Sequence, residues 1–104
     1  NTLILSHVVE HMRLEDFAGT IAHCAGKGVG YLYLDIPHIT EDSHKAWRGW
    51  TNTHVLEGGW NDIEAILAQH GYGKVSGEST PRCYASQRGM STLRKEQQAY
   101  AATL

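Results

Sequence analysis

Residues 29–36 (VGYLYLDI) constrain the fold more than any other part of the chain. Residues 31–34 are aromatic or aliphatic without interruption, a pattern typical of a strand that is covered on both faces. Pro37 follows, and the strand is expected to end there because proline cannot donate a hydrogen bond to a neighbouring strand. The run therefore predicts a central strand that is buried on both of its faces.

Helix and strand patterns alternate around this run. Residues 2–6 form a short apolar segment without helical spacing, and we expect them to pair in parallel with residues 29–36. In residues 14–25 the apolar side chains recur on one helical face, with two acids in the first turn, where the helix dipole favours them. A second helix is predicted to begin at Asn61, with that residue as its cap, and to end at Gly71.

The remaining segments complete an α/β pattern. Residues 73–77 and 83–87 are predicted to form two short strands joined by a turn, and residues 91–102 a terminal helix. The order predicts one α/β domain over residues 1–104, with parallel strands, an antiparallel C-terminal hairpin at the edge and flanking helices. The given sequence starts at Asn1, inside the first predicted strand, so we expect a fragment of a longer domain. The alternative is a processed or tagged chain whose original start was removed.

One long loop interrupts the pattern. Residues 38–59 are polar, aromatic and irregular, and a loop of about 20 residues in a small domain is usually functional or disordered. Trp47 and Trp50 favour a loop that is at least partly packed.

Composition narrows the class of protein without assigning a function. Of the 104 residues, 41% are hydrophobic and 19% are charged, which is typical of a globular domain. No apolar run reaches the roughly 18 residues of a membrane span, and no signal peptide pattern is present, so no membrane partner and a cytoplasmic location are expected. Cys24 and Cys83 form no paired motif and are expected to be free thiols. Bases outnumber acids after Ala65, which favours a solvated basic face.

Three stretches in a fixed order carry a family resemblance. They are LILSHVVEH, then EDFAGTIAHC with GKGVGYLYLDIPH, then HVLEGGWNDIEAILAQHGY. An apolar strand ending near a Glu-His pair, a helix, a glycine turn and a strand ending at proline resemble the second half of class I S-adenosylmethionine-dependent methyltransferase domains. The helix that ends in Gly71 and Tyr72, and the hairpin after it, also match that family. The resemblance covers residues 3–87 and implies a partial Rossmann-like methyltransferase sheet and S-adenosylmethionine as the methyl donor.

The sequence departs from the family where the cofactor is held. In the family a glycine-rich turn after a strand wraps the methionine part of the cofactor, and an acid on the next strand binds the ribose. Gly26, Gly28 and Gly30 imitate the glycine pattern, but they follow a helix and enter a strand, whereas a cofactor loop leaves a strand and opens a helix. The resemblance therefore implies that the chain supplies the substrate side of the site and that the missing N-terminal half, or a partner subunit, grips the cofactor.

The candidate site follows from the end of the first strand. Ligands of open α/β sheets bind outside the carboxyl ends of the strands, and residues 6–11 leave the first strand at that edge. By the resemblance, Ser6 and His7 line the cofactor. Glu10 and His11 face the acceptor, and a histidine with a pKa in its ordinary range suits general-base chemistry. The alternative is a purely structural role, in which Glu10 caps the next helix and His11 packs beneath it.

A metal site is a second interpretation of the same residues. His7, Glu10 and His11 lie within five residues, and His54, in the long loop, can return to the same edge. We predict that these four residues converge, and imidazoles with a carboxylate suit a divalent metal. Small-RNA 2′-O-methyltransferases show a similar cluster with an acid where His7 stands. The near-neutral charge and the absence of a basic stripe favour a small-molecule acceptor over RNA.

Two other classes remain open. HVVEH matches the HxxEH signature of zinc metallopeptidases, which requires the motif on a helix and a further acidic ligand. The missing glycine turn also allows a non-enzymatic module with a methyltransferase-like fold, or a partner subunit without cofactor. The sequence upstream of Asn1 would discriminate between the enzyme and the module.

Overall fold

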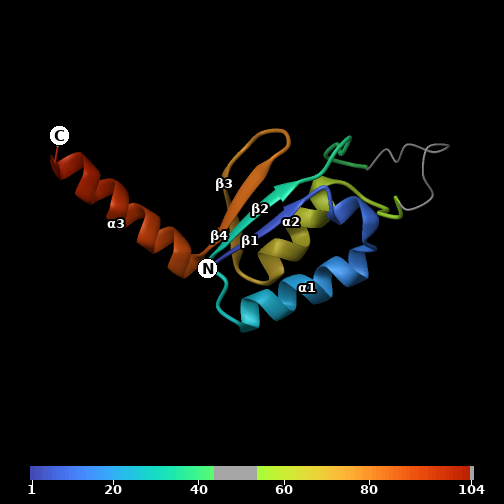
Figure 1. Cartoon of the computed structure of the whole chain (residues 1–104), viewed down its shortest axis with the longest axis horizontal. Helices are drawn as coiled ribbons and strands as arrows, with labels where there is room; N and C mark the ends of the chain where they lie inside the picture. The colour runs from blue at the N-terminus through green and yellow to red at the C-terminus, as the bar shows by residue number, and fades with distance from the viewer. Residues whose placement is uncertain (44–53, 104) are drawn as a thin grey trace.

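The computed structural model describes residues 1–43 and 54–103 as an α/β structure (Figure 1). Trp47 and Trp50, expected to pack within the long loop, lie outside the described residues. The strands are β1 (Thr2–Ser6), β2 (Tyr31–Asp35), β3 (Tyr72–Ser76) and β4 (Arg82–Ser86). The helices are the short 3-10 turn η1 (Val9–His11) and the α-helices α1 (Leu14–Gly26), α2 (Trp60–Gln69) and α3 (Gln87–Thr103).

The sheet has the strand order β1-β2-β4-β3. β1 and β2 pair in parallel with Ser6 opposite Asp35, which confirms both the predicted pairing and the interior position of β2. β4 runs antiparallel to β2 and to β3, so the predicted hairpin exists. Its returning strand lies inside the sheet, not at the edge as expected. The connection through α2 leaves one place open between the parallel strands β2 and β3, and β4 fills it.

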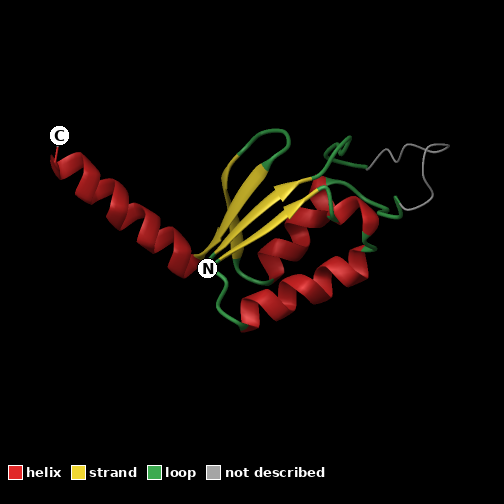
Figure 2. Cartoon of the chain, in the orientation of Figure 1, coloured by secondary structure: helices red, strands yellow, loops and turns green. Residues whose placement is uncertain are grey.

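A single core lies between the sheet and two helices. Leu32 and Leu34 of β2 pack with Phe17 of α1 and Ile63 of α2, and all four are at most 1% exposed. Figure 2 shows α1 and α2 on the same side of the strands. Burial along β2 therefore alternates instead of being continuous.

The expectation that β2 is buried on both faces is wrong for the described part of the chain. Tyr31 and Tyr33 point to the face opposite α1 and α2, and both are only half buried. Ile4 on β1 and Val75 on β3 are 64% and 44% exposed. Tyrosine tolerates a partly solvated face because its ring is apolar and its hydroxyl is polar. The continuous apolar run therefore predicted the strand correctly, but the burial of its second face wrongly.

The start of α2 differs from the predicted cap at Asn61. Gly59 is the N-cap, and its N–H donates to the Asp62 carboxylate at 3.0 Å. The next two N–H groups, of Trp60 and Asn61, donate to the carbonyls of Thr40 and Glu41 at 2.8 Å each. Backbone from the long loop therefore satisfies the first turn, a long-range solution that local capping rules do not anticipate. α3 likewise begins earlier than expected, directly after β4.

Replacing Gly59 with alanine is expected to lower the free energy of unfolding by about 1–3 kcal/mol, the usual cost of overpacking. A Cβ at this position would collide with the backbone of Glu41 and Ser43. Urea denaturation would measure the change. Gly19→Ala is the matched control, because no atom lies within 4 Å of its added Cβ and the helix interior favours alanine. Equal effects of the two substitutions would show that the contact at Gly59 yields without cost.

Candidate functional site

The candidate site lies at the sheet edge where β1 and β2 both end. Ser6 and Asp35 are paired across the two strands, and the N–H of His7 donates to the Asp35 carbonyl at 2.9 Å. His7 has a φ of 57°, so the chain turns sharply as it leaves β1. η1 follows directly, which places Glu10 and His11 beside the same edge.

Asp35 is the hub of the first group of side chains at this edge. Its carboxylate lies 3.4 Å from His7 Nε2 and accepts hydrogen bonds from Ser6 Oγ at 3.5 Å and Thr80 Oγ1 at 3.1 Å. Thr80 also accepts from the N–H of Ile36 at 2.9 Å, which ties the β3–β4 turn to the end of β2. Sequence reasoning did not select Asp35. The available signal was an acid at the last position of the clearest strand, two residues before Pro37.

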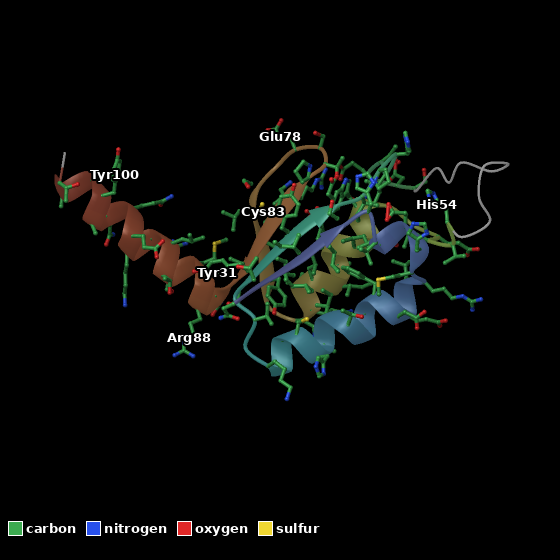
Figure 3. The ribbon with its side chains drawn as sticks, viewed as in Figure 1. Tyr31, His54, Glu78, Cys83, Arg88 and Tyr100 are labelled. Atoms are coloured by element: carbon green, nitrogen blue, oxygen red, sulfur yellow. The ribbon has the colours of Figure 1, made fainter. Side chains whose placement is uncertain are left out.

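His11 and His54 form a second group, held together by the backbone of Glu10. The Glu10 carbonyl accepts from the N–H groups of Val55 and Leu56 at 3.0 and 3.2 Å, which fixes the end of the long loop against η1. The ring centroids of His11 and His54 are 4.7 Å apart and the planes are almost perpendicular. His54 lies beside the segment that follows β1 (Figure 3). The structure thus brings His11 and His54 together beside the backbone of Glu10, while the His7 side chain pairs with Asp35.

The Glu10 side chain is the unusual feature of this edge. Glu10 is 1% exposed, and neither carboxylate oxygen has a hydrogen-bond partner among the described residues. Leaving a buried polar group unpaired costs free energy, so such groups are uncommon in folded proteins. The bland interpretation, in which Glu10 caps the next helix, does not fit, because α1 has Arg13 as its N-cap and no side-chain cap.

The predicted ligands do not form one preassembled metal shell. Within residues 1–43 and 54–103, no group of three or more His, Cys, Asp or Glu side chains is arranged to hold a metal ion. The HxxEH interpretation also loses its structural basis. His7 lies in a turn and only Val9–His11 is helical, as a single 3-10 turn, so the two histidines do not share the face of an α-helix.

Arg82 anchors a second cluster close to the same edge. Its guanidinium is 2% exposed, pairs with Glu41 and lies 3.3 Å from Glu64. It also stacks over the Trp60 ring at 4.4 Å. The expectation of a basic surface toward the C-terminus is therefore wrong for Arg82. Burial lowers the pKa of Arg82, but the hydrogen bond that Arg82 donates to Glu41 and the charges of Glu41 and Glu64 outweigh it, so the pKa is raised.

Tyr84 extends this cluster along β4. Its hydroxyl donates to Glu64 at 2.8 Å, and burial, followed by the adjacent Glu64, raises the pKa of the phenol far above its ordinary value. Tyr84 therefore remains a neutral donor. Arg82, Glu64 and Tyr84 join β4 to α2, and Glu41 adds the start of the long loop. We interpret this cluster as the support that fixes the loop beside the strand ends.

Comparison with known proteins assigns no family. No protein-family model, curated protein or solved structure matches the chain. Within the described ranges, none of the helices combines the length and apolar character that a membrane crossing requires.

Proposed function

We propose that this chain supplies the substrate side of an S-adenosylmethionine-dependent methyltransferase. The fold supports the proposal in its coarse features. β1 and β2 are parallel with α1 between them, α2 follows, and an antiparallel hairpin closes the sheet. In open α/β sheets, ligands bind at the carboxyl ends of such strands. The residues that the resemblance selects lie at that edge.

The buried carboxylate of Glu10 is the observation that carries the proposal. The carboxylate is 1% exposed and has no hydrogen-bond partner among the described residues, which supports a role as acceptor for a group outside them. S-adenosylmethionine is a cation at its sulfur and at its amino group, and its ammonium group can donate a hydrogen bond to a shielded carboxyl group. Ser6 and His7 are exposed beside Glu10 and can line such a ligand.

In this proposal His11 takes the proton from the acceptor. Methyl transfer forms a bond from the acceptor oxygen or nitrogen to the methyl carbon and breaks the methyl–sulfur bond, and the acceptor gives up one proton. His11 is exposed at the strand edge, so its imidazole can reach an acceptor in the solvent. His54, whose ring meets His11 at 4.7 Å, restricts the orientation of that imidazole.

Two observations bear on the alternatives. The contact between the His11 and His54 rings is the observation that favours a divalent metal as a second candidate ligand, although no group of three ligating side chains among the described residues is arranged to hold one. A non-enzymatic module without a ligand would not explain the Glu10 carboxylate, whose oxygens have no hydrogen-bond partner among the described residues.

We predict that S-adenosylmethionine binds the 104-residue chain weakly and only at the strand ends. The sequence lacks a glycine-rich turn that leaves a strand and opens a helix, so most of the contacts that hold such a cofactor are missing. Calorimetry should show no micromolar affinity. Amide NMR spectra at millimolar ligand should shift at Ser6, His7 and Glu10, while α3 stays unchanged.

Adenosine, which lacks the charged amino acid and sulfonium, is the control ligand and should leave Glu10 unaffected. Shifts on α3 without shifts at β1 would contradict the assigned site. Micromolar affinity would show that this chain holds the cofactor by itself and that the assignment of the two halves is wrong.

A further inference from the structure

The sheet face opposite α1 and α2 contains an apolar groove. Ile4, Tyr31, Tyr33, Val75, Cys83 and Leu93 line it, and its volume is about 410 Å³. Ile4 and Val75 are among the most exposed large apolar residues of the described chain. In α/β proteins, helices usually cover such an apolar sheet face. An apolar patch that stays exposed commonly marks an interaction surface.

The start of α3 forms one wall of this groove, and the rest of the helix extends away from the sheet. Its first turn is fixed against the sheet, since the Tyr31 hydroxyl donates to the Gly89 carbonyl at 3.4 Å and Leu93 lines the groove. The rest of α3 projects away from the sheet (Figure 1). Tyr100 is 67% exposed and lies far out on the helix (Figure 3).

The apolar stripe of α3 continues past the sheet. Met90, Leu93, Gln97, Tyr100 and Ala101 follow the spacing of one helical face, and all but Gln97 are apolar, aromatic or alanine. The first two face the sheet of their own chain: Leu93 lines the groove, and a Cβ added at Gly73 of β3 would lie 3.7 Å from the Met90 side chain. The outer part of the stripe is exposed at both Tyr100 and Ala101.

Length and charge identify an occupant for the groove. The ten residues of α3 beyond Leu93 span about 15 Å, and a sheet of four strands measures about 14 Å from its first to its last strand. α3 carries Arg88, Arg94 and Lys95 against Glu96. The whole chain has nine basic and eleven acidic residues, so six basic and ten acidic residues remain outside α3, a net charge of −4 against +2.

We infer that the chain forms a two-fold symmetric dimer in which α3 of each copy lies in the groove of the other. Every copy carries both a groove and a projecting helix, so one two-fold axis satisfies both contacts at once and closes the assembly. The basic helix meets the acidic body of the second copy, and the outer stripe at Tyr100 covers the exposed face at Ile4 and Val75. The site at the ends of β1 and β2 does not take part in this contact, so the dimer is independent of the proposed methyl transfer.

Sedimentation velocity on the 104-residue chain tests the dimer. We expect twice the monomer mass of 11.5 kDa at tens of micromolar chain, and weaker association at high salt because α3 and the rest of the chain carry opposite net charges. Val75→Glu, in the groove, and Tyr100→Glu, on the helix, should each weaken dimerisation at least tenfold. Val8→Glu is the matched control, since Val8 lies outside the groove and is 41% exposed against 44% for Val75.

Mixing the two variants separates a helix in a groove from other dimers. Val75→Glu keeps an intact helix and Tyr100→Glu keeps an intact groove, so the mixture restores one complete contact per dimer and should associate more tightly than either variant alone. A monomer at 100 micromolar chain would overturn the inference. A dimer that tolerates both substitutions would also overturn it, as would a mixture no tighter than its components. Far-ultraviolet circular dichroism checks that each variant is folded.

Discussion

Replacing Arg82 with alanine is expected to lower the free energy of unfolding by about 3–5 kcal/mol, the usual cost of removing one partner from a buried ion pair. The Arg82 side chain is 2% exposed and pairs with Glu41 and Glu64. Its guanidinium also donates to the carbonyls of Glu78 and Ser79 at 2.8 and 3.2 Å. A domain of this size has a total stability of about 5–15 kcal/mol, so the substitution removes a large part of it.

Most of this loss of stability comes from the neighbouring groups that lose their contact with the guanidinium. Glu64, with 30% of its side chain exposed, would lie in a partly desolvated position without its ion-pair partner, and Tyr84 would still donate to it. The Trp60 ring, which lies 4.4 Å below the guanidinium, would face a cavity. Glu41 adds less because 55% of its side chain is exposed, and solvent screens that pair.

Arg13→Ala is the matched control for the Arg82 substitution. Arg13 and Glu15 also form an ion pair, at 3.8 Å, but both side chains are more than 70% exposed. Its loss should cost less than about 1 kcal/mol. Arg82→Lys should fall between the two alanine variants, since lysine keeps the charge and loses the planar fork of donors. Urea denaturation followed by tryptophan fluorescence measures all three. If Arg82→Ala costs no more than Arg13→Ala, the cluster does not support the fold.

The strands could be predicted from sequence because their signal is local. Residues 2–6 and Tyr31–Asp35 are short apolar runs bounded by turn residues, and a helix between two such runs favours parallel pairing. Whether helices cover a given face of the sheet cannot be predicted from such local patterns. Tyr31 and Tyr33 have the same sequence pattern whether a helix covers them or not, and only the positions of α1 and α2 show that they are open.

The site could be predicted only as far as strand ends determine it. Ser6, His7, Glu10 and His11 follow β1 directly, so their shared edge follows from the strand assignment. The partners of Asp35 and Arg82 could not be found in this way. Thr80 is 45 residues from Asp35 in the sequence, and Glu41 is 41 residues from Arg82. Such contacts depend on how the long loop and the hairpin fold back, which no local pattern in a single sequence encodes.

Replacing Glu10 with methionine is expected to raise the stability of the protein and to abolish ligand binding at the strand ends. Neither carboxylate oxygen of Glu10 has a hydrogen-bond partner among the described residues, although the residue is 1% exposed. An unpaired buried polar group costs about 1–3 kcal/mol, and an apolar side chain of similar size avoids that cost. For a domain of this length, each kilocalorie per mole raises the melting temperature by about 4–8 °C.

The substitution isolates the side chain from the fold. Glu10 fixes the end of the long loop through its carbonyl oxygen, which accepts from Val55 and Leu56, and methionine keeps that carbonyl. A gain in melting temperature therefore reports on the carboxylate alone. Glu15→Met, at a position with 74% of the side chain exposed, is the matched control and should change stability by less than about 0.5 kcal/mol.

Stability and binding together decide what the carboxylate is for. A residue retained for its ligand weakens the fold in the absence of that ligand, so Glu10→Met should melt higher and lose the NMR shifts that S-adenosylmethionine induces at Ser6 and His7. Glu10→Gln keeps the shape and removes the charge, so it should also lose the shifts if the ligand is recognised as a cation. A lower melting temperature for Glu10→Met would mean that the carboxylate stabilises the folded chain itself. A cationic ligand at this edge would then lose its main support.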